Sequence, residues 1–363
     1  MYFSKWVTKL LVCAVTLPGM GAVMADFSEG VAAYKAGRYE EAAKFFSGMA
    51  DANDPRAQFA LGLLYDNGQG VAQDPTVAAG WYRKAAEQGY AKAQYNLALI
   101  CQEGRGVEAD QEQARHWFGE AARRGNPDAV ARLRRVAGEG EAAAQLTLGR
   151  MYLAGEGVPR DDRQAAKWFG VAAEQGYTDA VFALAYLTER GAGVSRSASR
   201  AMELYQQAAE QGKLEAAYNL SRFYLDGRGT PRDPARAREL LVKAARGGVT
   251  AAQVALAMLL EEGEPFGRNL EQAVAWYERA ALAGHSDAQI NLAYLYAQGV
   301  GTQRDQPKAL AWYRIAAESG SRTAADNAAN LLEHLDAQGK AKADDYLAQL
   351  KAQIAGHDHI ASR

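Results

Sequence analysis

Apolar residues recur along this chain with the spacing of an α-helix. In residues 57–89, taken here as the reference unit, a first stripe occupies positions one, five, eight and nine: Ala57, Leu61, Leu64 and Tyr65. A second stripe follows at i, i+3, i+4 and i+7: Ala78, Trp81, Tyr82 and Ala85. Each stripe puts its apolar side chains on one helix face, so the pattern predicts two amphipathic helices per unit.

Between the two stripes, every unit carries a glycine and a helix-capping residue. The glycine can adopt the left-handed conformation that ends a helix, and Asp, Asn or Ser is a typical N-cap. The glycines are Gly68, Gly104, Gly155, Gly191, Gly227, Gly263 and Gly299, and the caps are Asp74, Asp110, Asp161, Ser197, Asp233, Asn269 and Asp305. Asp110 with Gln113, and Asp161 with Gln164, also have the spacing of a capping box.

The glycines are 36 residues apart except for one step of 51 residues between Gly104 and Gly155. A fixed period of this size is typical of repeat proteins, in which each unit buries its apolar face by stacking on its neighbours. We therefore expect an elongated all-α array rather than a body with one deep pocket. The extra residues fall at 126–141, where we expect one irregular helix and a kink.

Five of the six tryptophans occupy one slot in the second stripe: Trp81, Trp117, Trp168, Trp276 and Trp312. We interpret them as packing residues between units rather than as an aromatic ladder for sugars or bases, because they share a face with the core alanines.

The reference unit resembles the Sel-one-like repeat family, a relative of the tetratricopeptide repeat. The resemblance lies in the residue types at fixed positions, from Ala57-Gln58 through Gly68-x-Gly70 and Trp81-Tyr82 to Gly89. This resemblance implies a right-handed α/α superhelical solenoid of tandem helix hairpins with terminal caps. It also implies a protein-binding scaffold or adaptor of the cell envelope. Seven units would cover 57–125 and 142–320, with a tetratricopeptide-like capping hairpin at 26–56 and capping helices and a tail at 321–363.

The first 25 residues have the features of a signal peptide. Lys5 and Lys9 precede a short apolar run, and the residues up to Ala25 suit a signal-peptidase site. We expect export to the periplasm or cell envelope, with membrane contact only if this segment stays uncleaved. Without it the net charge is near −4, which offers no broad positive field for nucleic acid. Cys101, the one remaining cysteine, is expected to be a small buried hydrophobe.

Catalytic motifs are missing from the sequence. It contains no nucleophile elbow, phosphate loop or zinc-protease helix motif, and its five histidines lack metal-ligand spacing. We therefore expect a protein without enzymatic activity, cofactor or metal. The alternatives are a cell-wall hydrolase or a β-lactamase-like enzyme, although the serine–lysine motif and paired cysteines that the latter would need are absent.

Partner binding is expected on the side of the first helices that faces away from the core, on the inner curve of the array. Position seven varies in size and charge, and its Tyr and Arg residues are typical of protein-binding hot spots. The predicted contact residues, from positions four and seven, are Asn96, Arg150, Tyr186, Asn219, Arg222, Asn291 and Tyr294. The asparagines would bond the backbone of a bound peptide or, alternatively, tie one helix to its neighbour. Other hypotheses are a periplasmic immunity protein against a secreted toxin and carbohydrate binding through exposed tyrosines.

Overall fold

The structure is a computed structural model that describes the backbone of residues 21–361 and the side chains of residues 27–356. Most of the expected signal peptide, residues 1–20, lies outside the described residues. Residues 21–361 form nineteen α-helices and no strand, which confirms the all-α class.

The first nine helices are α1 (Gly21–Lys35), α2 (Tyr39–Asp51), α3 (Pro55–Asn67), α4 (Pro75–Glu87), α5 (Ala91–Glu103), α6 (Gln111–Arg123), α7 (Pro127–Gly138), α8 (Ala142–Ala154) and α9 (Asp162–Glu174). The other ten are α10 (Thr178–Arg190), α11 (Ala198–Glu210), α12 (Leu214–Asp226), α13 (Pro234–Arg246), α14 (Thr250–Glu262), α15 (Leu270–Leu282), α16 (Ser286–Gln298), α17 (Gln306–Glu318), α18 (Arg322–His334) and α19 (Ala337–Ala361).

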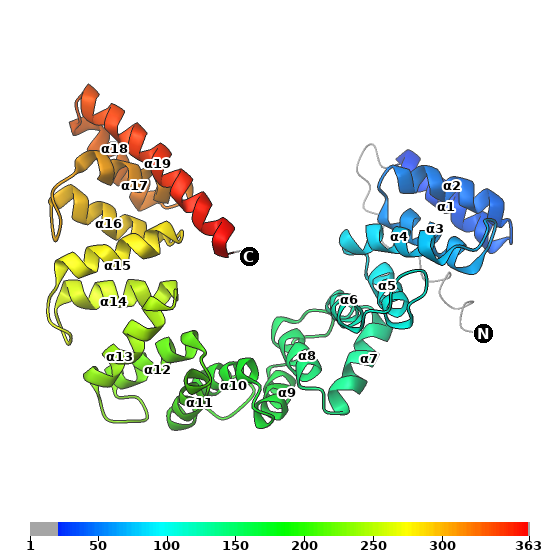
Figure 1. Cartoon of the computed structure of the whole chain (residues 1–363), viewed down its shortest axis with the longest axis horizontal. Coiled ribbons are helices and arrows are strands. Elements are labelled where there is room, and N and C mark those ends of the chain that lie inside the picture. The colour runs from blue at the N-terminus through cyan, green and yellow to red at the C-terminus, as the bar shows by residue number, and fades with distance from the viewer. Residues whose placement is uncertain (1–20, 362–363) are drawn as a thin grey trace. The chain divides into compact units, whose positions relative to one another are not determined.

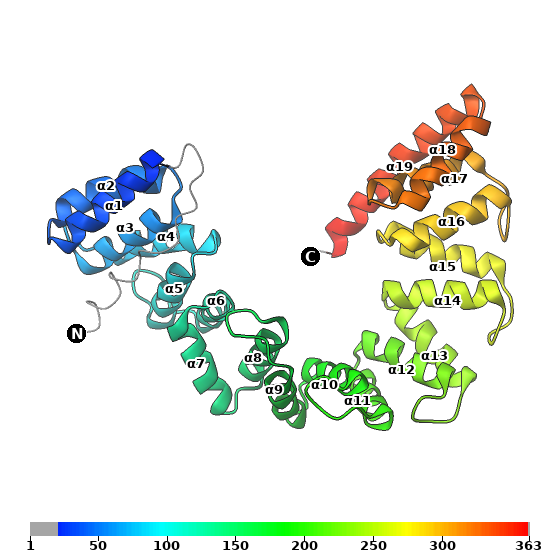
Figure 2. The ribbon, with the colours of Figure 1, turned by 180° about the vertical axis from the view of Figure 1, so that it is seen from behind.

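Two compact units make up the chain, one ending at Gln175 and the other beginning at Gly176. The first unit contains α1–α9 and the second contains α10–α19. Figures 1 and 2 show these helices in chain order, coloured from blue to red. Within each unit, consecutive helices pack as antiparallel pairs such as α5 with α6 and α16 with α17, and each pair packs on the next. This is the α/α solenoid arrangement that the sequence predicts.

The predicted helix ends are confirmed at all seven glycines and all seven caps. The glycines adopt the left-handed conformation, with φ between +66° and +99°. Each cap side chain accepts a hydrogen bond from a backbone N–H of the second helix. The pair α14 and α15 forms in the same way, although its loop contains Pro265 and Phe266 in place of Gly-x-Gly.

Only half of each expected capping box forms. The Asp110 and Asp161 carboxylates accept from the Gln113 and Gln164 N–H groups, but the cap N–H that the glutamine side chain should bond is already used. The Asp110 N–H donates to the Cys101 carbonyl at 2.8 Å, and the Asp161 N–H donates to the Tyr152 carbonyl at 2.9 Å. Gln113 Nε2 instead donates to the Asp110 carboxylate at 2.9 Å. All seven caps make this backbone bond to position nine of the first helix, so the bond closes every hairpin.

In four loops, the second glycine brings the hairpin against the backbone at the start of the preceding second helix. A Cβ at Gly106 would overlap the backbone of Pro75, the first residue of α4, and Gly70, Gly229 and Gly301 approach the preceding second helix in the same way. Arg105 and Arg228, the residues between the loop glycines, then reach back to carboxylates one repeat earlier. Arg105 Nη1 lies 2.6 Å from Asp66, and Arg228 Nη1 lies 2.8 Å from Glu189.

The most deeply buried aromatic ring of most repeats follows the tryptophan slot rather than occupying it. Tyr82, Phe169, Tyr205 and Tyr277 are at most 1% exposed. The tryptophans at 81, 117, 168 and 276 are only half-buried, and Trp312 alone among the five is fully buried. The tryptophan slot is therefore the edge of the core, and the Tyr or Phe slot is its centre.

Helix α7 interrupts the alternation of helix pairs in the first unit. It packs on α6 and on α8 without a hairpin partner of its own. Gln145 Nε2 of α8 donates to the Ala137 carbonyl of α7, as Gln94 does to Ala86 in a regular repeat. The loop glycine Gly157 meets Ala122 near the end of α6 instead of the start of a second helix. The kink expected at 126–141 stays a prediction.

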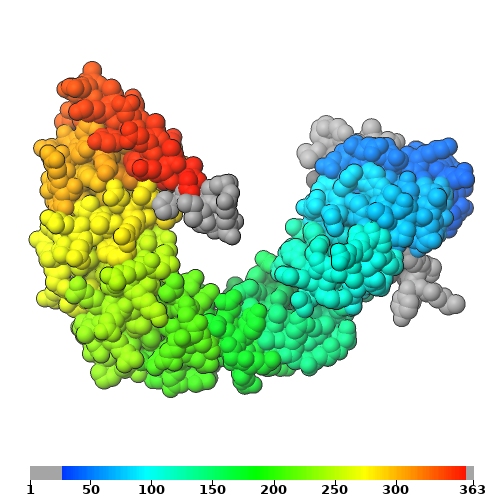
Figure 3. All heavy atoms as spheres, in the orientation of Figure 1, coloured from blue at the N-terminus to red at the C-terminus, as the bar shows by residue number. Residues whose placement is uncertain are grey.

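Two helices follow the last hairpin, in the region where capping helices are expected. α18 packs on α17 as a further first helix would. α19 packs mainly on α17 and also touches α15, and Figure 3 shows it lying against the surface of the second unit. Tyr346 donates to Asp305 at 3.1 Å, and Arg314 lies 2.6 Å from Asp344. Leu350 of α19 belongs to the same apolar cluster as Trp312.

Because the loop glycine lies against the preceding helix, replacing it with alanine should strongly reduce stability. Gly106→Ala should lower the free energy of unfolding by about 2 kcal/mol or more, because φ is +68° and the Cβ would overlap Pro75. The matched control is Gly80→Ala, whose Cβ meets nothing within 4 Å in α4 and which should be neutral or stabilise by up to about 1 kcal/mol. Chemical denaturation measures both, and equal stability of the two variants would contradict the packing role.

Candidate protein-binding surface

Four side chains at position seven form a series on the first helices of the second unit. They are Tyr186 on α10, Arg222 on α12, Met258 on α14 and Tyr294 on α16, and we call them the position-seven row. All four are exposed, with exposed fractions of 40% for Tyr186, 44% for Met258 and 51% for Tyr294. Among the described side chains only one other large hydrophobic residue, Tyr177, is exposed.

The helix period explains why this position stays accessible. Its neighbour at position eight is buried in the core, as Leu187 and Leu295 show with exposed fractions of 1% and 0%. Successive residues on a helix are about 100° apart, so burying positions one, five and eight turns position seven away from the second helix. Core packing therefore does not restrict the residue type at position seven, and each repeat of the second unit carries one such exposed side chain on its first helix.

A partly buried polar cluster joins α10 and α11 to the loop that follows α12. Tyr205 Oη donates to Glu189 at 2.9 Å, and Arg228 donates to the other oxygen of that carboxylate at 2.8 Å. Burial raises the pKa of the Tyr205 hydroxyl, and Glu189 raises it further. The charge of Arg222 lowers the pKa of the same hydroxyl, and Tyr186 raises it.

A neighbouring arginine holds the Tyr186 ring of the row. Arg190 Nη1 donates to Tyr186 Oη at 2.6 Å, and its guanidinium lies 5.2 Å from the centre of the Tyr186 ring. Tyr294 lies close enough to the Tyr313 hydroxyl to raise its pKa, although burial is the main cause. The Tyr186 ring is therefore exposed on one side and supported on the other, a favourable arrangement for an anchor in protein recognition.

The other predicted contact residues are placed differently. Arg150 is exposed on α8, but it belongs to the first unit. Asn96 and Asn291 hydrogen-bond the Tyr82 and Tyr277 hydroxyls of the preceding second helices, which favours the helix-tying alternative for these two residues. Asn219 is half-buried at the equivalent position of α12. Leu63 and Leu99, which hold position seven in the first unit, are also half-buried.

Met258 was not among the predicted contact residues, although it stands in the position-seven series. Its thioether is flexible and polarisable, which suits an adaptable contact surface. Its periodic position was the signal that could have identified it.

The row offers rings, a thioether and a guanidinium, which can bind by contact but include no nucleophile or acid–base pair. In residues 21–361, no group of three or more His, Cys, Asp or Glu side chains is arranged to hold a metal ion. Cys101 is buried as expected, with 1% of its surface exposed, and burial raises the pKa of its thiol. No helix in the described part of the chain is long and apolar enough to cross a membrane.

Comparison with protein families identifies the repeat. A model of the Sel1 repeat matches residues 55–90, 91–126, 142–177, 178–213, 214–249, 250–285 and 286–321. The chain belongs to the Sel1 repeat family. The seven matches cover all seven glycine-and-cap hairpins and leave out α7, α1–α2 and α18–α19. The Sel1 repeat is a scaffold suited to protein–protein interaction, and the family is generally non-catalytic.

Solved structures of Sel1 repeat proteins are similar to this chain. A Sel1 repeat protein from Oxalobacter formigenes is 34% identical, with a TM-score of 0.53 and coverage of 87% of this chain and 90% of that one. The protein c5321, described as a protective antigen present in uropathogenic Escherichia coli strains, is 31% identical, with a TM-score of 0.50 and coverage of 91% and 69%. The immunity protein Pa5087 from Pseudomonas aeruginosa is 21% identical, with coverage of 59% and 83%, and its TM-score of 0.37 carries no argument about function. None of the curated proteins compared with the chain matches it.

The buried tyrosines predict a loss of stability at alkaline pH. Burial, followed by the adjacent Asp66, Glu189 or Glu261 carboxylate, raises the pKa values of Tyr82, Tyr205 and Tyr277 above their ordinary value of about 10. The unfolded chain therefore loses these protons first. The stabilisation is complete below about pH 10 and decreases as the pH rises towards the folded-state pKa values.

Thermal melting between pH 7 and pH 11.5 measures this effect. The melting temperature should stay level to about pH 9 and fall above about pH 10. The control with all three tyrosines replaced by Phe should be less stable at pH 7, because it lacks the hydroxyl hydrogen bonds, yet should fall less steeply. Parallel curves for the two proteins would show that the tyrosines do not cause the alkaline loss.

Proposed function

We propose that the protein is a non-catalytic scaffold or adaptor of the cell envelope that binds a partner protein or peptide along the position-seven row. The observation that carries this proposal is the row itself. Three of the four exposed large hydrophobic side chains among the described residues stand at one repeat position, and an exposed arginine holds that position in the repeat between Tyr186 and Met258. Exposed apolar and aromatic side chains on a rigid helix surface are typical of protein contacts.

The spacing supports an extended contact. The row advances by one repeat, or 36 residues, from Tyr186 to Arg222 and again to Met258 and Tyr294. A partner that contacts several members therefore gains from each without reordering the scaffold, because the helices are already held by the core and the caps. Tyr and Arg are enriched among the residues that contribute most to such interfaces.

The proposed location in the cell envelope rests on the features of residues 1–25, which resemble a signal peptide. We propose that this segment directs export and is cleaved after Ala25. Arg150 is a further contact residue only for a partner that also contacts the first unit. Asn96, Asn219 and Asn291 are proposed to stabilise the first helices of their repeats.

The test replaces the whole row with Ala. Tyr186→Ala, Arg222→Ala, Met258→Ala and Tyr294→Ala together should remove the specific partner recovered by affinity capture from the envelope fraction and identified by mass spectrometry. The loss is expected because few residues contribute most of the binding energy of an interface. Helicity and melting temperature should change little, because all four side chains are exposed.

The control variant carries Tyr177→Ala, Gln207→Ala and Lys243→Ala. These residues are also exposed in the second unit, and Tyr177 has the same 40% exposure as Tyr186, but none belongs to the row. This control should recover the partner as the unmodified protein does. Equal recovery by the row variant and the control would refute the proposed surface.

A further inference from the structure

A cleft opens between the second helices of two repeats in the second unit, away from the position-seven row. It has a volume of about 350 Å³ and is lined by Arg238, Val242, Arg246, Leu256, Leu260, Gln272 and Trp276. Leu256 and Leu260 of α14 are each 2% exposed, whereas Val242 and Trp276 on α13 and α15 are half-buried. The cleft therefore has an apolar floor with one aromatic wall.

The charged groups that line the cleft are both arginines. Arg238 and Arg246 stand on α13 with Val242 between them, and neither lies within ion-pairing distance of a carboxylate in the described residues. A third cation, the Arg279 guanidinium, lies 4.6 Å from the centre of the Trp276 ring. An occupant that combines carboxylates with a large apolar side chain would complement these groups.

The chain itself shows what covers this face one repeat further on. Trp312 occupies on α17 the slot that Trp276 occupies on α15, and it is fully buried in a cluster that also contains Leu350 of α19, the helix that packs on α17 and α15. Asp344 of α19 accepts a hydrogen bond from Arg314 at 2.6 Å. Tyr346, Leu347 and Leu350 of the same helix join the apolar cluster that includes Trp312 and Trp276. An amphipathic helix with an acidic residue beside Tyr and Leu thus packs on the second helices.

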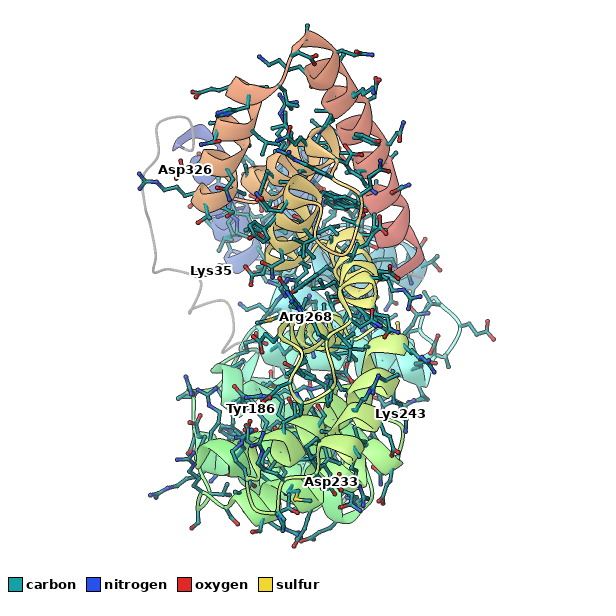
Figure 4. The ribbon with its side chains drawn as sticks, turned by 90° about the vertical axis from the view of Figure 1, so that its left-hand side faces the viewer. Lys35, Tyr186, Asp233, Lys243, Arg268 and Asp326 are labelled. Carbon is teal, nitrogen blue, oxygen red and sulfur yellow. The ribbon has the colours of Figure 1, made fainter. Side chains whose placement is uncertain are left out.

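We propose that the Trp276 cleft binds an amphipathic helix of a partner protein, with a large apolar side chain on Leu256, Leu260 and Trp276 and carboxylates on Arg238 and Arg246. The site adjoins the surface that α19 occupies, since Trp276 packs against the cluster containing α19 residues. It is distinct from the row, because none of the four row residues lines the cleft. Figure 4 shows the Tyr186 and Lys243 side chains from α10 and α13.

The probe is a fluorescent peptide of residues 337–356, which carries the required chemistry in its Asp344-Asp345-Tyr346-Leu347 segment. It is added to the full chain and followed by fluorescence anisotropy. The peptide does not replace α19, because a helix tethered in the same chain has an effective concentration of about a millimolar at its own site. The cleft should bind the peptide saturably, with a dissociation constant in the micromolar range, because a short helix must order on binding.

Arg238→Glu with Arg246→Glu should weaken peptide binding by about tenfold or more, because the carboxylates would then face like charges. The milder Arg238→Gln with Arg246→Gln should weaken it in the same direction and serves if the charge reversal unfolds the protein. The matched control reverses Arg115 and Arg163, exposed arginines on second helices of the first unit, and should bind as the unmodified protein does.

Two further outcomes decide the proposal. A peptide with Asp344→Asn and Asp345→Asn should bind the unmodified protein more weakly and lose little further affinity on the arginine variants. The position-seven row variant should bind the peptide normally, which separates this site from the proposed function. Absence of saturable binding, or equal affinity of the arginine variants and the control, would overturn the proposal.

Discussion

The close approach of one hairpin's loop backbone to the preceding hairpin is the contact on which the rest of the structure depends. At Gly106, and likewise at Gly70, Gly229 and Gly301, the chain passes so near the start of the preceding second helix that no side chain fits. The cap N–H bonds the end of the first helix in the same loop, and so fixes the loop at both sides. Because this contact repeats, the helices align and the same positions face solvent in successive repeats.

Much of this arrangement could be predicted from sequence because its causes are local. Left-handed glycines, N-caps and apolar periodicity act within one hairpin, and these predictions are confirmed at all seven glycines and caps. The capping box is incomplete at Asp110 because its N–H bonds Cys101, an interaction nine residues back that the motif does not contain. The tryptophan slot is not uniform for a similar reason, since Trp312 is buried in a cluster that also contains Leu350 of α19, which lies outside its hairpin.

The candidate sites likewise combine features that sequence predicts with features that only the structure shows. Position seven could be identified from the repeat frame, which placed Tyr186, Arg222 and Tyr294 on the row that the structure shows to be exposed. Pattern alone did not distinguish the asparagines that tie helices from residues available to a partner. The cleft beside Trp276 was not predictable, because its lining comes from three helices. Sequence also could not show that its two arginines have no carboxylate within ion-pairing distance in the described residues.

The central claim is that the Sel1 repeats work by contact through the position-seven row. Hydrogen–deuterium exchange of the protein alone and with its captured partner tests this most directly, since it reports which helices a partner covers without altering any residue. The account predicts increased protection in α10, α12, α14 and α16, with little change in α3 and α5, where position seven is half-buried. Protection confined to the first unit, or none in these four helices, would contradict it.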